Sequence, residues 1–111
     1  VVASSIAPSG TATVKAVAVR RGRLVSPDGT EFALDAPITL GRSDDCDIVL
    51  ADPLVSRRHA EVRPALGAHL LIDLGSSNGT VVNGEPTLQH LLQIGDRVSI
   101  GTHELTYLAD S

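Results

Sequence analysis

The stretch HLLIDLGSSNGTVVNGE, residues 69–85, alternates two kinds of segment that together indicate a β fold. Residues 69–74 and 80–82 are dominated by Leu, Ile and Val, which favour a pleated, half-buried surface. Between them, residues 75–79 are rich in the Gly, Ser and Asn of turns and loops. Asn83-Gly84 then supplies the two residues that a tight hairpin turn needs at positive φ. The stretch therefore predicts strand, polar loop, strand and hairpin turn.

Outward from this stretch, short apolar or alternating runs recur about every eight to twelve residues, with turn residues between them. Pro27-Asp28-Gly29 separates two such runs and predicts a hairpin. Residues 88–94 show a weak helical spacing of apolar residues, which Gly95 ends. The pattern as a whole predicts an all-β sandwich. The other predicted strands are residues 23–26, 30–34, 38–40, 48–50, 59–63, 97–100 and 104–108.

The composition limits the class of protein. The 111 residues suffice for one core, and because 42% are hydrophobic but only 2% aromatic, we expect that core to consist of Val, Leu, Ile and Ala. No apolar run approaches the roughly 20 residues that span a bilayer, and no signal peptide is evident, so we expect no membrane insertion. The net charge of −4 argues against general nucleic-acid binding, which needs many cations along one face.

The start of the chain differs from the rest. Residues 1–13 are mostly Ser, Ala, Pro, Gly and Thr without periodicity, which predicts a flexible leader before a domain at residues 14–109. Phosphorylation of Thr11 or Thr13 would let this leader compete for a binding site on its own domain or on a neighbouring copy, at high effective concentration. The single Cys46 cannot form an internal disulfide, which points to a reducing compartment, so we expect a cytoplasmic protein.

Three predicted loops carry side chains suited to binding phosphate: Gly41-Arg42, SRRH at residues 56–59, and SSNGT at residues 76–80. An antiparallel sandwich gathers loops at one end, so these three can form one rim. Arg holds phosphate with two charge-assisted hydrogen bonds, Ser hydroxyls donate to phosphate oxygens, and Asn both donates and accepts. Each element alone is equally compatible with an exposed Arg, a turn Ser or an Asn-Gly turn, but together they predict a local phosphate site.

In this order and separation, Gly41-Arg42, Ser56-x-x-His59, Asn78-Gly79 and Asn83-Gly84 resemble the signature of the forkhead-associated (FHA) domain, over residues 24–108. The resemblance implies a two-sheet β-sandwich of about eleven strands whose loops at one end bind a phosphothreonine peptide. It also implies no catalysis and no cofactor. The implied partners are phosphothreonine-containing proteins, namely a Ser/Thr protein kinase or its substrate.

The resemblance implies a role for each matching residue. Arg42 and Ser56 match phosphate-binding positions, and Arg57 matches a neighbouring phosphate contact. Ser77 matches a position that flanks the phosphoresidue, and Asn78 matches the residue that hydrogen-bonds the peptide backbone. The positions that shape the loops are Gly41, His59, Gly79, Asn83 and Gly84.

FHA-like sites also hold the threonine methyl group in a small pocket, here expected to be walled by His59 and residues 77–79. Phosphothreonine should then be preferred to phosphoserine. The alternative that remains open is an FHA fold used for phosphate-independent association or self-assembly.

Other patterns in the chain predict no catalytic or metal site. Residues 75–79 match the G-x-S-x-G of serine hydrolases, but that motif needs a strand, a sharp turn and a helix in a larger α/β fold. The four histidines and Cys46 lack metal-ligand spacing. Residues 44–52 lack the Gly and the closing Glu of a calcium loop, and we interpret their acidic residues as a solvated edge that repels acidic peptides. These acidic residues are Asp44, Asp45, Asp47 and Asp52.

Overall fold

The computed structural model describes residues 21–110, so the predicted leader with Thr11 and Thr13, and residues 14–20 of the predicted domain, lie outside the described residues. Within residues 21–110 the chain forms eleven strands and no helix, and hence no helix there that could span a membrane. The strands are β1 (Gly22–Val25), β2 (Glu31–Ala33), β3 (Ile38–Gly41), β4 (Ile48–Val49), β5 (Ala60–Ala65), β6 (Ala68–Asp73), β7 (Thr80–Val82), β8 (Glu85–Thr87), β9 (Gln89–Leu91), β10 (Arg97–Ile100) and β11 (His103–Ala109).

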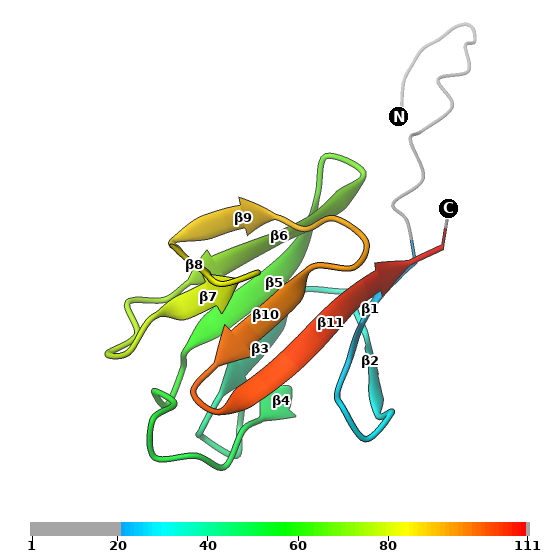
Figure 1. The fold of residues 1–111 in the computed structure, drawn as a ribbon. Helices are drawn as coiled ribbons and strands as arrows, with labels where there is room; N and C mark the ends of the chain where they lie inside the picture. The colour runs from blue at the N-terminus through cyan, green and yellow to red at the C-terminus, as the bar shows by residue number, and fades with distance from the viewer. Residues whose placement is uncertain (1–20, 111) are drawn as a thin grey trace, which may run out of the picture.

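The strands form two sheets packed face to face, with the order β2-β1-β11-β10-β7-β8 in one and β4-β3-β5-β6-β9 in the other (Figure 1). All pairings are antiparallel except that of β3 with β4. The core between the sheets is mainly aliphatic, as expected from the composition. The predicted all-β sandwich is confirmed.

The two predicted hairpin turns are present. Asn83 and Gly84 have φ values of 52° and 86° and join β7 to β8, with Val82 paired to Glu85. Residues 27–29 connect β1 to β2, where Gly29 has φ 89°. These φ values are open to Gly and Asn at little steric cost, which is why the sequence signal was reliable at both turns.

The weak helical spacing at residues 88–94 does not correspond to a helix in the structure. This segment contains β9, whose residues pair with β6 in the register Leu70 to Leu91 and Ile72 to Gln89. Leu88 is 78% exposed, Leu91 41% and Ile94 49%, so the apolar residues that suggested a helix face do not form a buried stripe. Strand pairing with β6 decides the local structure, because a three-residue segment is too short for its own propensity to do so.

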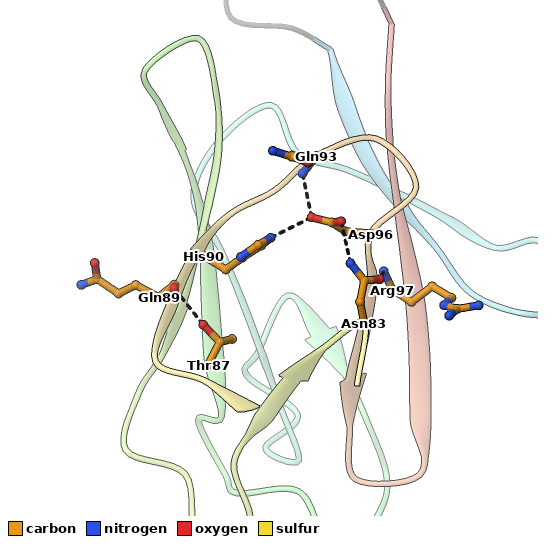
Figure 2. A network of polar contacts seen from close by, with 7 residues as sticks. All are labelled: Asn83, Thr87, Gln89, His90, Gln93, Asp96 and Arg97. Atoms are coloured by element: carbon orange, nitrogen blue, oxygen red, sulfur yellow. Dashed lines mark hydrogen bonds and ion pairs between the residues drawn. The ribbon is translucent and has the colours of Figure 1, made fainter. Parts of the chain in front are cut away.

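An extensive polar network fastens the β7–β8 turn to the start of β10 (Figure 2). Asp96 accepts hydrogen bonds from Asn83 Nδ2 at 2.9 Å, from His90 Nε2 at 2.8 Å and from the backbone N–H of Gln93 at 2.8 Å. Burial alone would raise the pKa of Asp96, but these hydrogen bonds outweigh it and leave the pKa below its usual value. Asn83 thus organises this turn with its side chain as well as its backbone.

Candidate functional site

The three predicted binding loops converge on one pocket of about 260 Å³. They are the β3–β4, β4–β5 and β6–β7 connections. Four of these strands lie side by side in one sheet, in the order β4-β3-β5-β6, and β7 lies in the other sheet. All five residues predicted to bind the phosphopeptide line the pocket. The lining consists of Arg42, Pro53, Leu54, Val55, Ser56, Arg57, Ser77 and Asn78.

Gly41 allows the β3–β4 and β4–β5 loops to touch. The backbone N–H of Arg42 donates to the Ser56 carbonyl at 3.0 Å, and the N–H of Ser43 donates to the Arg57 carbonyl at 3.1 Å. A Cβ at Gly41 would lie 2.8 Å from the Arg57 carbonyl carbon and 2.9 Å from Cys46 Sγ. Only glycine fits at this position, because larger residues would push the two loops apart.

The Arg42 guanidinium is held in place at Nε, and its two terminal nitrogens face no partner within residues 21–110. Its Nε donates to the Val55 carbonyl at 2.9 Å. A guanidinium has five N–H donors, so the four on its terminal nitrogens stay available for a ligand. Arg42 is therefore oriented toward the pocket before any ligand arrives.

His59 connects the β4–β5 loop to the β6–β7 loop through its ring. It has no exposed surface, its Nδ1 accepts from the Ser56 N–H at 3.1 Å, and its Nε2 donates to the Gly79 carbonyl at 2.8 Å. Because the carbonyl can only accept, Nε2 carries the proton and the ring is in the tautomer with a free Nδ1 lone pair. This burial also contradicts the prediction that His59 walls a methyl pocket, since its ring does not line the pocket.

The β6–β7 loop is held by Asp73, a residue that the sequence analysis did not single out. Asp73 accepts from the N–H groups of Gly75 and Ser76, both at 2.8 Å, and from the hydroxyls of Ser76 and Thr80 at 2.6 and 2.7 Å. Burial would raise the Asp73 pKa, but the bonds from Ser76 and Thr80 outweigh it and lower the pKa. Gly79 closes the loop at φ 86°. An Asp two residues before Gly-Ser is the sequence signal that could have revealed this turn.

Ser77 and Asn78 face the pocket from this loop. The backbone N–H of Ser77 donates to Ser56 Oγ at 3.0 Å, and Asn78 Nδ2 donates to the Leu54 carbonyl at 2.8 Å. Within residues 21–110 the Ser56 hydroxyl proton is engaged in no hydrogen bond, so it is free to donate. Asn78 likewise keeps its Oδ1 and its second Nδ2 proton for a ligand.

The pocket concentrates positive charge. Within the described part of the chain, neither Arg42 nor Arg57 has a carboxylate partner, although both line the pocket. A second pocket of about 210 Å³, on the other side of the β6–β7 loop, is lined by Asp73 and uncharged residues. A third, near Arg23, has its cation paired with Glu31 and Asp110, both at 3.5 Å. The first pocket therefore offers two guanidinium groups, those of Arg42 and Arg57, that form no ion pair within residues 21–110.

The acidic residues near the pocket differ from one another. Asp44, Asp45 and Asp47 are exposed, as predicted for a solvated edge. Asp52 is only 6% exposed and accepts hydrogen bonds from Leu54 and Thr102, so the prediction is wrong for this residue. No group of three or more His, Cys, Asp or Glu residues that could hold a metal ion occurs in the range 21–110.

Comparison with known proteins gives a consistent result. The family model of the FHA domain matches residues 38–101. The chain is 49% identical over 82 residues to the oxoglutarate dehydrogenase inhibitor of Corynebacterium efficiens, with 73% of this chain covered. It is 46% identical over 102 residues, 91% of its length, to the glycogen accumulation regulator GarA of Mycolicibacterium smegmatis. The chain spans 58% and 61% of the lengths of these two relatives.

A solved FHA domain superposes closely on this fold. It comes from a structural and functional analysis of phosphothreonine-dependent FHA domain interactions, and its TM-score is 0.77 at 34% sequence identity. The match covers 82% of this chain and 98% of that one. The likeness therefore extends over a complete domain of known architecture.

Proposed function

Because the chain belongs to the forkhead-associated (FHA) domain family, we propose that it binds proteins phosphorylated on threonine and that residues 42, 56, 57, 77 and 78 form the recognition site. The observation that carries this proposal is the pocket itself. Two unpaired guanidinium groups and a Ser hydroxyl gather there, in a chain whose net charge is −4. Such local positive charge suits a single phosphate rather than an extended polyanion.

In this proposal the phosphate is bound from two loops at once. Arg42 approaches with the four donors of its terminal nitrogens, and Arg57 adds a second cation from the β4–β5 loop. The Ser56 hydroxyl accepts from the Ser77 N–H, which orients its own proton toward the pocket. A phosphate group with a charge of about −1.5 to −2 matches this combination of two cations and a neutral donor.

The rest of the partner peptide is proposed to run over the β6–β7 loop. Asn78 is held at Nδ2 by the Leu54 carbonyl and offers its remaining amide groups to the peptide backbone. Ser77 flanks the phosphoresidue. Pro53 and Leu54, the latter 48% exposed, supply the apolar surface on which a threonine methyl group can rest in place of the predicted wall at His59.

At the level of the cell, we propose a regulatory adaptor without catalytic activity that docks on a Ser/Thr protein kinase or its substrate. The similarity to an inhibitor and to a regulator supports this role. A cytoplasmic location, where the free Cys46 stays reduced, is part of the same proposal.

The proposal is tested by isothermal titration calorimetry with three peptides that share one sequence and carry phosphothreonine, phosphoserine or threonine. An oriented phosphothreonine library first identifies that sequence. Loss of the phosphate removes charge-assisted hydrogen bonds of about 1.5 to 3 kcal/mol each, so affinity should fall at least about 100-fold. Equal binding of the unphosphorylated peptide would instead support phosphate-independent association.

Phosphoserine should bind about tenfold more weakly than phosphothreonine, because one methyl group in an apolar pocket contributes on that order. Equal affinity for the two phosphopeptides would remove the apolar methyl contact while leaving phosphate binding intact.

A further inference from the structure

The β4–β5 connection contains a tight turn at residues 52–55, and two hydrogen bonds to Asp52 close it. The Val55 N–H donates to the Asp52 carbonyl at 2.9 Å, and the Leu54 N–H donates to Oδ1 of Asp52 at 2.9 Å. Asp in the first position and Pro in the second, here Pro53, favour such a turn. Asp52 therefore holds the turn with both its main chain and its side chain.

The other carboxylate oxygen of Asp52 fastens this turn to the opposite sheet. Oδ2 accepts from the Thr102 N–H at 2.8 Å and from the Thr102 hydroxyl at 2.6 Å, and Thr102 lies in the turn between β10 and β11. A Cβ at Gly101 would lie 2.7 Å from this oxygen, so the backbone of the β10–β11 turn lies close to the Asp52 carboxylate. The hydrogen bonds from Thr102 and Leu54 lower the Asp52 pKa to about 2, so the carboxylate stays ionised.

The peptide group between Leu54 and Val55 connects this turn to the pocket. A trans peptide points its N–H and its C=O in opposite directions. Here the Val55 N–H points back at Asp52, while the Leu54 carbonyl accepts from Asn78 Nδ2 at 2.8 Å. The turn that Asp52 holds therefore determines where the Asn78 amide is held.

The peptide group between Val55 and Ser56 likewise donates to one side chain and accepts from another. The Ser56 N–H donates to His59, and the Val55 carbonyl accepts from Arg42 Nε. Two consecutive peptide groups thus orient two side chains from the other loops. His59 anchors the peptide group that holds Arg42, and Asp52 anchors the one that holds Asn78.

We propose that Asp52 is a positioning residue for phosphopeptide recognition, which acts through the 54–55 peptide group to hold the Asn78 amide in its binding orientation. The inference rests on the proposed function, since that proposal gives Asn78 its contact with the peptide backbone. Asp52 does not itself line the pocket, so it influences the ligand only through other residues.

The test is a double-mutant cycle on the peptide Kd, with wild type, Asp52→Ala, Asn78→Ala and the double variant titrated with one phosphothreonine peptide. Loss of a hydrogen bond of about 1 kcal/mol weakens binding about fivefold, which is the expected effect of each single substitution. Because Asp52 acts through Asn78, the double variant should bind within about twofold of Asn78→Ala alone. Independent, multiplicative losses would overturn the proposal, as would an Asp52→Ala protein that binds within about twofold of wild type.

Two further variants separate positioning from charge and folding. Asp47→Asn removes an exposed carboxylate that accepts from Thr39 at 2.8 Å and lies outside the pocket lining, so the affinity for the peptide should not fall. Asp52→Asn keeps an acceptor for the Leu54 N–H but offers Thr102 an amide donor, so its affinity should fall between wild type and Asp52→Ala. If Asp52→Ala does not fold, Asp52→Asn replaces it in the cycle.

NMR spectra of the free protein test the positioning role of Asp52 independently of phosphopeptide binding. The side-chain amide signals of Asn78 in NMR spectra of the free protein should shift in Asp52→Ala and stay unchanged in Asp47→Asn. Unchanged Asn78 signals in Asp52→Ala would refute the positioning role. Failure of wild type to bind any phosphothreonine peptide would refute the proposed function alone, because the NMR comparison would still report on Asp52.

Discussion

Replacement of Arg42 by alanine separates binding from stability more clearly than any other change in the pocket. One of its five N–H donors is used on the Val55 carbonyl, which leaves four on the terminal nitrogens. Two of these can face a phosphate as a fork, at about 1.5 to 3 kcal/mol for each charge-assisted bond. Since Arg42 is exposed and Arg57 remains in place, we take the lower end, about 3 kcal/mol, which is roughly 100-fold in Kd.

The fold should survive this change. Arg42→Ala removes one part-buried hydrogen bond to the Val55 carbonyl, worth about 1 kcal/mol, so the Tm should fall by no more than about 8 °C. Affinity is measured by calorimetry against a phosphothreonine peptide, and folding by circular dichroism. The matched control is Arg58→Ala. Arg58 is an exposed arginine of the β4–β5 loop, and its side chain does not line the pocket. The assignment would be falsified if folded Arg42→Ala bound the peptide within about twofold of wild type.

Distinct effects are expected from substitutions at Gly41, His59 and His69. In Gly41→Ala the new Cβ presses on the Arg57 carbonyl, so urea unfolding should show a loss of about 1 to 3 kcal/mol and calorimetry should show weaker peptide binding; unchanged values for both would contradict the close approach. In His59→Ala the loss of two hydrogen bonds at a fully buried site should lower the Tm by about 10 °C or more and weaken binding indirectly; an unchanged Tm would argue against its organising role. Burial lowers the pKa of His69, which donates to Leu34 and accepts from Tyr107, so the folded state favours the neutral ring. The stability from this preference is complete above the ordinary value of 6.5 and is lost as pH falls below it, so wild type should lose more stability than His69→Gln between pH 8 and about pH 5 in urea unfolding.

The side chains proposed to bind the phosphopeptide could be predicted from the sequence, because residue type and loop position are local properties of the chain. Arg, Ser and Asn in turn-rich segments between strands indicate loops with phosphate-binding groups, whatever the rest of the chain does. Their roles were carried by a resemblance in order and spacing. That all of them line one pocket depends on the arrangement of β3, β5 and β6 side by side, with β7 in the other sheet.

Strands and turns were predicted well where apolar alternation and turn residues follow each other directly in the sequence. Examples are β1, β2 and the Asn83-Gly84 turn. Strands were missed where pairing with a neighbouring strand, rather than the local sequence, determines the conformation. The strand β8 contains Pro86, which lacks an N–H for the ladder, and β9 is three residues long. Neighbouring strands supply the hydrogen bonds that stabilise both, and single-segment patterns do not contain that information.

The class of fold, the position of the loops and the side chains that can meet a phosphate could be predicted from the sequence, since they follow from local conformational preference and side-chain chemistry. Which polar residues hold those loops depends on how the two sheets pack. Asp52 looked like one member of an exposed acidic run, yet its partner Thr102 lies 50 positions further along the chain. His59 likewise meets Gly79 across 20 positions. Burial and hydrogen bonding between segments so far apart arise only when the two sheets pack, and for that reason local sequence cannot distinguish an organising residue from a solvated one.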